Sequence, residues 1–132
     1  MQTTARATEP TATSFWDEWK RLRHHILAAL EHAGDTHTEH DILDLLRNDQ
    51  AQFWPAENSA MITEIVGYPN GNHCRIWLAG GEYDELRELE RDRLIPWARQ
   101  RGCRRIELVG RKGWARRLKD YEEVATVLAK EI

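Results

Sequence analysis

The sequence predicts an α+β protein in which helices flank one central, mostly antiparallel sheet. Helical periodicity of apolar residues dominates before residue 50, and short runs rich in β-branched and aromatic residues, separated by turn residues, follow it. The chain has 132 residues and 41% hydrophobic content, enough for one core. We therefore expect a single domain over residues 14–132. Residues 1–13 are rich in Thr and Ala without periodicity, which predicts a flexible tail.

Two helices are predicted first. Ser14 is a candidate N-cap with Asp17 three residues later, and apolar residues then fall on one face until Gly34 ends the helix. A second, shorter helix follows Thr38, and Asp41 completes its expected capping box. Both helices present one apolar face, so both should pack on the sheet.

Three strands are predicted next, over residues 52–54, 60–68 and 73–78. The segments between them read "PAENS" and "PNGN", which are rich in turn-forming residues. Because such short connections join neighbouring strands, we expect these three strands to pair antiparallel.

The last part of the chain alternates helix and strand. A helix is predicted over residues 82–100, and Pro96 should kink or split it. A short buried strand is expected over residues 104–110, a helix over 112–121 and a final strand over 124–132.

The composition argues against membrane insertion. Mean hydropathy is -0.70, and no stretch approaches the roughly 20 apolar residues that a membrane-spanning helix needs. The N-terminal segment lacks the apolar region of a secretory signal, so we expect a cytoplasmic protein. In that reducing compartment Cys74 and Cys103 should be free, buried thiols.

Basic residues are concentrated in one segment. Residues 91–119 carry eleven of the nineteen basic residues against two acidic ones, a local balance of +9 within a net charge of -3. Such a segment could bind nucleic acid, a phosphate-bearing cofactor or an acidic partner. The alternative is a solvated face that the acidic remainder of the chain neutralises.

Two longer stretches carry a resemblance to a known family. They read "HCRIWLAGG" and "IELVGRKGWARRLKDYEEVATVL", a strand with a glycine turn and a strand-helix-strand unit. Over about residues 14–132 the chain resembles the GNAT N-acyltransferase superfamily. It is similar in particular to small GNAT-like proteins of tailed bacteriophages and prophages, which tend to share "TEIVxYP", "WLAGG" and "GRKGW".

The resemblance implies a place for acetyl-CoA, where strands 74–79 and 105–109 would splay apart. Pantetheine would pair with the backbone of residues 76–79, and the pyrophosphate would rest on the N–H groups after Gly80. The implied cofactor-binding residues are Ile76, Trp77, Leu78, Ala79, Gly80 and Gly81. An amine would attack the thioester directly, which requires a base, oxyanion donors and an acid for the thiolate.

The glycine turn departs from the family pattern. The usual loop has Gln or Arg, two residues, Gly, one residue, then Gly or Ala, whereas this chain offers only "AGG" before Glu82, Asp84 and Glu85. Each acid stabilises the positive end of its own helix by roughly 0.3–1 kcal/mol and repels a bound anion. The cations that could compensate are Arg111, Lys112 and Arg116. The sequence therefore favours no cofactor, with acetyl-CoA as the alternative.

Three residues are candidates for catalysis. Glu64 lies on a central strand among apolar residues, where burial would raise its pKa toward that of a useful base, and Glu107 has a similar setting. The alternative for both is an outward-facing strand residue, which strand alternation favours. The family's acid is commonly a tyrosine on the last helix; Leu118 stands nearer that position, so Tyr121 is either a displaced acid or a core aromatic.

Other patterns bear on partners. Five of the six histidines fall between His24 and His40, but their spacing matches no structural zinc pattern, so no metal site is expected. Trp16 does not share the apolar stripe of Phe15 and Trp19, and an exposed aromatic patch would mark a protein partner.

The sequence therefore predicts a phage- or prophage-encoded GNAT-like protein with a degenerate cofactor loop. Its expected role is binding or assembly with a phage or host protein, in the host cytoplasm or in a virion. The alternatives are an acetyl-CoA-dependent N-acetyltransferase of unspecified acceptor, and nucleic-acid binding through residues 91–119.

Overall fold

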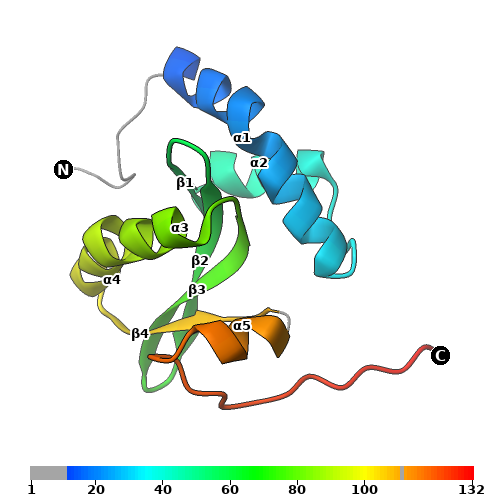
Figure 1. Cartoon of the computed structure of the whole chain (residues 1–132), viewed down its shortest axis with the longest axis vertical. Coiled ribbons are helices and arrows are strands. Elements are labelled where there is room, and N and C mark those ends of the chain that lie inside the picture. Colours follow the sequence, from blue (N-terminus) through cyan, green and yellow to red (C-terminus); the bar gives the residue numbers. More distant parts are fainter. Residues whose placement is uncertain (1–11, 111) are drawn as a thin grey trace.

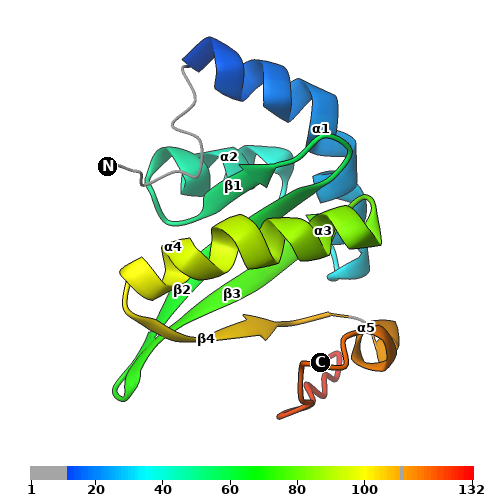
Figure 2. The same cartoon turned by 60° about the vertical axis from the view of Figure 1, so that its left-hand side comes forward.

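The structure is a computed structural model that describes residues 12–110 and 112–132. A four-stranded sheet carries helices on both faces (Figures 1 and 2). The elements are α1 (Ala12–His32), α2 (Glu39–Arg47), β1 (Gln52–Pro55), β2 (Ala60–Tyr68), β3 (Gly71–Gly80), α3 (Tyr83–Leu89), η1 (Glu90–Leu94), α4 (Ile95–Gln100), β4 (Cys103–Leu108) and α5 (Lys112–Arg117). The predicted α+β class is confirmed. No helix in the described ranges is long and apolar enough to cross a bilayer.

The sheet is mixed, with the strand order β1-β2-β3-β4. The pairings of β1 with β2 and of β2 with β3 are antiparallel, as their short connections predict. The pairing of β3 with β4 is parallel, because α3, η1 and α4 carry the chain back between these strands.

Each face of the sheet has its own apolar cluster. Ala60 and Ile62 of β2 contribute to the cluster under α1 and α2, and Met61 between them contributes to the cluster under α3 and α4. This alternation follows from the two-residue period of a strand. Since helices cover both faces here, the start of β2 is buried without interruption.

A β-bulge at Trp77 changes which face β3 presents. Ile62 pairs with Leu78, but the next residue of β2, Thr63, pairs with Ile76, so Trp77 is an extra residue on β3. As a result Ile76 packs into the α3–α4 cluster while Leu78 packs into the α1–α2 cluster.

The two predicted helix starts have different outcomes. Thr38 caps α2, and its side chain and that of Asp41 form the reciprocal hydrogen bonds of a capping box. Ser14 is not an N-cap: α1 begins at Ala12, so Ser14 lies within the first turn. Residues before Ala12, including most of the predicted tail, lie outside the described residues.

The predicted break near Pro96 takes the form of a π-helical segment. Proline has no N–H, and in regular α-helix its ring would crowd the carbonyl four residues earlier, that of Asp92. The wider π-turn of η1 precedes Pro96, and Ile95 N–H bonds to the carbonyl oxygen of Glu90. The helix therefore continues through the proline.

The predicted final strand, residues 124–132, does not form. Regular structure ends with α5 at Arg117, and residues 121–132 form no strand or helix. Tyr121 is hydrogen-bonded to Glu90 of η1, so the chain leaves α5 toward that helix and not along β4. In Figure 1 the C-terminal segment projects away from the sheet.

Candidate functional site

A cavity opens where β3 and β4 separate. The two strands pair only as far as Ile76 and Leu108, and β3 then continues to Gly80 paired with β2 alone. Beyond this point lies a cavity of about 350 Å³ with a largely apolar wall. Its aromatic wall residues are Trp77, Tyr83, Trp114 and Tyr121. The volume is within the range of small-molecule sites, and the tryptophans line the space without filling it.

Three polar side chains form one end of this cavity. The Tyr121 hydroxyl donates a hydrogen bond to the buried carboxylate of Glu90. Arg87 places Nη1 at 3.2 Å from Glu90, too poorly aligned for a hydrogen bond, and Nη2 at 2.6 Å from Asp120. Burial and the contact with Glu90 raise the pKa of Tyr121. Tyr121 is thus held protonated as a donor to Glu90, which makes it a weaker acid toward a leaving thiolate.

Glu90 was missed by the sequence analysis although the sequence holds a signal for it. It lies four residues after Leu86 and four before Leu94, on the apolar stripe of its helix. A carboxylate in such a stripe indicates a buried polar group, and Glu90 is 6% exposed. Its partner Tyr121 is distant in sequence, so only the fold reveals the pair.

The glycine turn after β3 packs closely against other parts of the chain. A Cβ atom at Gly80 would lie 2.8 Å from the His25 carbonyl oxygen of α1. Gly81 has a φ of +123°, and a Cβ there would lie 2.4 Å from Ser59 Oγ. The same Ser59 hydroxyl accepts a hydrogen bond of 2.8 Å from Glu82 N–H. Both glycines are therefore required by packing and backbone geometry.

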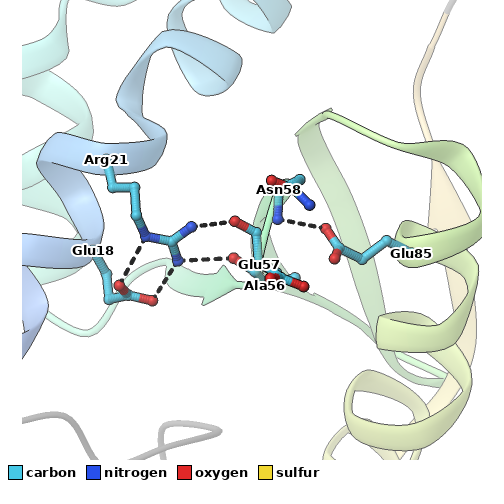
Figure 3. A network of polar contacts seen from close by, with 6 residues as sticks. All are labelled: Glu18, Arg21, Ala56, Glu57, Asn58 and Glu85. Carbon is cyan, nitrogen blue, oxygen red and sulfur yellow. Dashed lines mark hydrogen bonds and ion pairs between the residues drawn. The ribbon is translucent and has the colours of Figure 1, made fainter.

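A polar network connects the first turn of α3, the 56–59 loop and α1 (Figure 3). Glu85 of α3 accepts a hydrogen bond of 2.8 Å from Asn58 N–H. Arg21 of α1 donates to the carbonyl oxygens of Ala56, at 2.9 Å, and of Glu57. One of the acids at the start of α3 thus binds a backbone N–H of the chain itself.

The two candidate bases lie together, outside the cavity. Glu64 and Glu107 flank Arg75 across three neighbouring strands, on the sheet face opposite α3 and α4. Arg75 lies 3.9 Å from Glu64 and 3.7 Å from Glu107, and His73 Nδ1 lies 2.9 Å from Glu107. Both carboxylates are partly exposed members of an ion-pair network, which matches the outward-facing interpretation.

The predicted cofactor residues divide between cavity, core and turn. Ile76, Trp77 and Ala79 line the cavity, whereas the Leu78 side chain is buried in the α1–α2 cluster. Arg116 is exposed in the last turn of α5 and is not among the lining residues. Arg111 and the side chain of Lys112 lie outside the described part of the chain.

The basic residues of 91–119 are spread over η1, α4, β4 and α5, and several contact their own chain. Arg91 pairs with Asp92 at 2.7 Å, and Arg104 donates to the Asn70 carbonyl oxygen at 2.6 Å. The Arg117 guanidinium lies 3.7 Å from the centre of the Tyr83 ring. Self-contacts of this kind reduce the number of cations free for a phosphate ligand.

The structure also places the histidines, the cysteines and Trp16, for which the sequence made predictions. Within the described residues, no three His, Cys, Asp or Glu side chains come together as a metal-binding group. Cys74 and Cys103 are free thiols, as predicted, but only Cys74 is buried and Cys103 is partly exposed. Burial raises the pKa of Cys74 to about 12. Trp16 is 44% exposed, as its position off the stripe predicts.

The chain has no match among known proteins at the level of sequence family or structure. No family model matches it, and neither a curated protein nor a solved structure shows a significant similarity to it. The structure shows a mixed sheet with helices on both faces. The GNAT resemblance stays a prediction from the motifs.

Proposed function

We propose that this protein is a non-catalytic binding module with a GNAT-like fold whose partner is another protein. The observation that carries the proposal is the packed glycine turn. A GNAT enzyme would rest the cofactor pyrophosphate on the N–H groups after Gly80. Here Glu82 N–H is bonded to Ser59, and both glycines pack within their own chain.

The candidate catalytic groups support the same proposal. Amine acetylation needs a base, oxyanion donors and an acid around one reacting carbon. Glu64 and Glu107 form ion pairs with Arg75 on the sheet face that α3 and α4 do not cover. The Tyr121 hydroxyl donates its hydrogen bond to Glu90. Of the three, only Tyr121 lines the cavity, so a base and an acid do not converge on one reacting carbon.

A protein partner is supported by exposed apolar surface. Trp16 is 44% exposed on α1, with its ring edge-on to Phe15 at 5.1 Å between centroids. Aromatic residues are enriched in protein interfaces. The resemblance to phage-encoded proteins suggests an assembly role with a phage or host protein, in the host cytoplasm or in a virion.

Isothermal titration with acetyl-CoA tests the proposal. We expect no heat of binding at millimolar cofactor, because the chain's own hydrogen bonds occupy the turn. Titration with coenzyme A alone is the matched control, since it separates recognition of the nucleotide from recognition of the acetyl group. Saturable micromolar binding of either compound would contradict the proposal.

The open cavity favours a second candidate, an acetyl-CoA-dependent N-acetyltransferase. The space between β3 and β4 is where the thioester of such an enzyme would lie, and Trp77 and Trp114 leave it free. This candidate predicts thiol release from acetyl-CoA in the presence of an amine. It also predicts that Arg116→Glu weakens cofactor affinity more than Lys130→Glu, a charge change in the C-terminal segment.

A further inference from the structure

The C-terminal segment exposes an unusual number of apolar side chains. Val124, Val127 and Leu128 are 67%, 82% and 90% exposed, and Ile132 is fully exposed. Residues 121–132 form no regular structure, although β-branched residues are frequent among them. Clustered exposed apolar residues mark an interaction site. The segment has the composition of a strand and lacks a strand to pair with.

The sheet has a free edge that such a strand could join. β4 (Cys103–Leu108) is the last strand in the order and pairs on one side with β3. Among the described residues, no strand pairs with its other side. A free edge presents unpaired backbone N–H and C=O groups to an added strand.

The charges of the two segments are complementary. Arg104 and Arg105 of β4 are exposed, while the C-terminal segment carries Glu122, Glu123 and Glu131 against the single cation Lys130. Opposite charges on paired strands stabilise the pairing, whereas like charges oppose it. The edge of β4 therefore favours this segment over a second β4 edge.

We propose that residues 122–132 of one copy pair with the β4 edge of a second copy, which gives a strand-exchanged dimer. Tyr121 is bonded to Glu90 of η1, and within the described residues the segment that follows does not pair with its own β4. In a reciprocal two-fold pair each segment finds one free edge, and the assembly closes at two copies. The proposal does not depend on the proposed function.

Sedimentation velocity of the full chain over a concentration series provides the first test. We expect a dimer, and Val124→Ser/Leu128→Ser should raise its dissociation constant by at least about 100-fold, since apolar burial is lost in both copies. The control Ala125→Ser/Ala129→Ser places the same hydroxyls on the other face of the strand. A monomer at every concentration, or equal weakening by both pairs, would overturn the proposal.

Disulfide trapping provides the second test and identifies the pairing edge. Both chains carry Cys103→Ser; one adds Arg105→Cys and the other adds Ala125→Cys with a mass tag. After co-expression and oxidation, we expect a disulfide between the two different chains. Its absence, together with an intrachain disulfide when both cysteines are placed in one chain, would show that the segment joins its own β4 and would refute the exchange.

Discussion

The predicted cofactor site has two ends, the glycine turn after β3 and the splay between β3 and β4, and the two differ in the structure. At the turn after β3, Gly80 and Gly81 pack against α1 and the 56–59 loop. At the splay between β3 and β4, a cavity of about 350 Å³ is left open. The first end is closed by hydrogen bonds within the chain. The second is walled mainly by apolar and aromatic side chains, with Arg87 and Glu90 at one end.

The difference follows from the chemistry of the two surfaces. A turn into a helix exposes backbone N–H groups, and each needs a ligand, water or another part of the chain as partner. In this protein Ser59 supplies one partner to Glu82 N–H. An apolar wall makes no such demand, so a cavity can persist there. A glycine turn alone is thus insufficient evidence for a phosphate site.

The largest effect is expected from Gly81→Ala, which tests whether the turn is closed by packing. The positive φ and the overlap with Ser59 and the Asn58 carbonyl oxygen should together lower the free energy of unfolding by about 2–4 kcal/mol. Urea unfolding measures the change. Gly113→Ala is the control, since a Cβ there meets no atom within 4 Å, and stability should stay equal or rise by up to about 1 kcal/mol. Equal stability of both variants would show that the turn has space for a ligand.

The next largest effect concerns the polar end of the cavity. Tyr121→Phe removes a hydrogen bond to the buried Glu90 carboxylate, and we expect a loss of about 1.5–3 kcal/mol at neutral pH. Urea unfolding again reports it. No loss would mean that another donor satisfies Glu90.

The pH dependence of the same pair sharpens this prediction. The pKa of Tyr121 is raised above its usual value near 10.0 by burial and by Glu90. Its stabilising contribution is therefore fully present below pH 10 and is lost as pH rises through the folded-state pKa. The stability difference between the wild type and Tyr121→Phe should shrink above pH 10. A constant difference would contradict the assignment.

The smallest effect is expected at the start of α3. Glu85→Ala removes the hydrogen bond to Asn58 N–H, for an expected loss of about 0.5–1.5 kcal/mol. Glu88→Ala is the control, because Glu88 is an exposed acid in the second turn of the same helix. It should change stability by less than about 0.5 kcal/mol. Equal effects would show that the contact with Asn58 N–H adds nothing to stability. The comparison thus separates a specific contact with the loop from general electrostatics.

Local patterns predicted most of the fold. The capping box of Thr38 and Asp41 depends on residues three positions apart, and the bounds of β2 follow from adjacent turn residues. Both expectations are confirmed because neither needs a distant contact. Ser14 was assigned wrongly as a cap: α1 includes Ala12 and Thr13, and the local sequence does not fix helix ends to the residue.

The candidate site could be predicted only in part. Ile76, Trp77 and Ala79 were expected beside a cleft, and they line the cavity. Arg87 and Glu90 were not anticipated, because their partners Tyr121 and Asp120 lie about thirty residues away. In the sequence, the only sign of a long-range pair of this kind is a polar residue within an apolar stripe.

The sequence by itself determined the α+β class, the main helices and strands, and the glycines of the β3–α3 turn, because periodicity, capping and turn chemistry act over a few residues. The tertiary structure decided how these parts are used. It packs the glycine turn against Ser59 and α1, and it places Glu64 and Glu107 on either side of Arg75. It also leaves residues 124–132 without the strand pairing that their composition predicts. A segment forms a strand only when the unpaired edge of another strand lies beside it, and the whole fold decides where such edges lie.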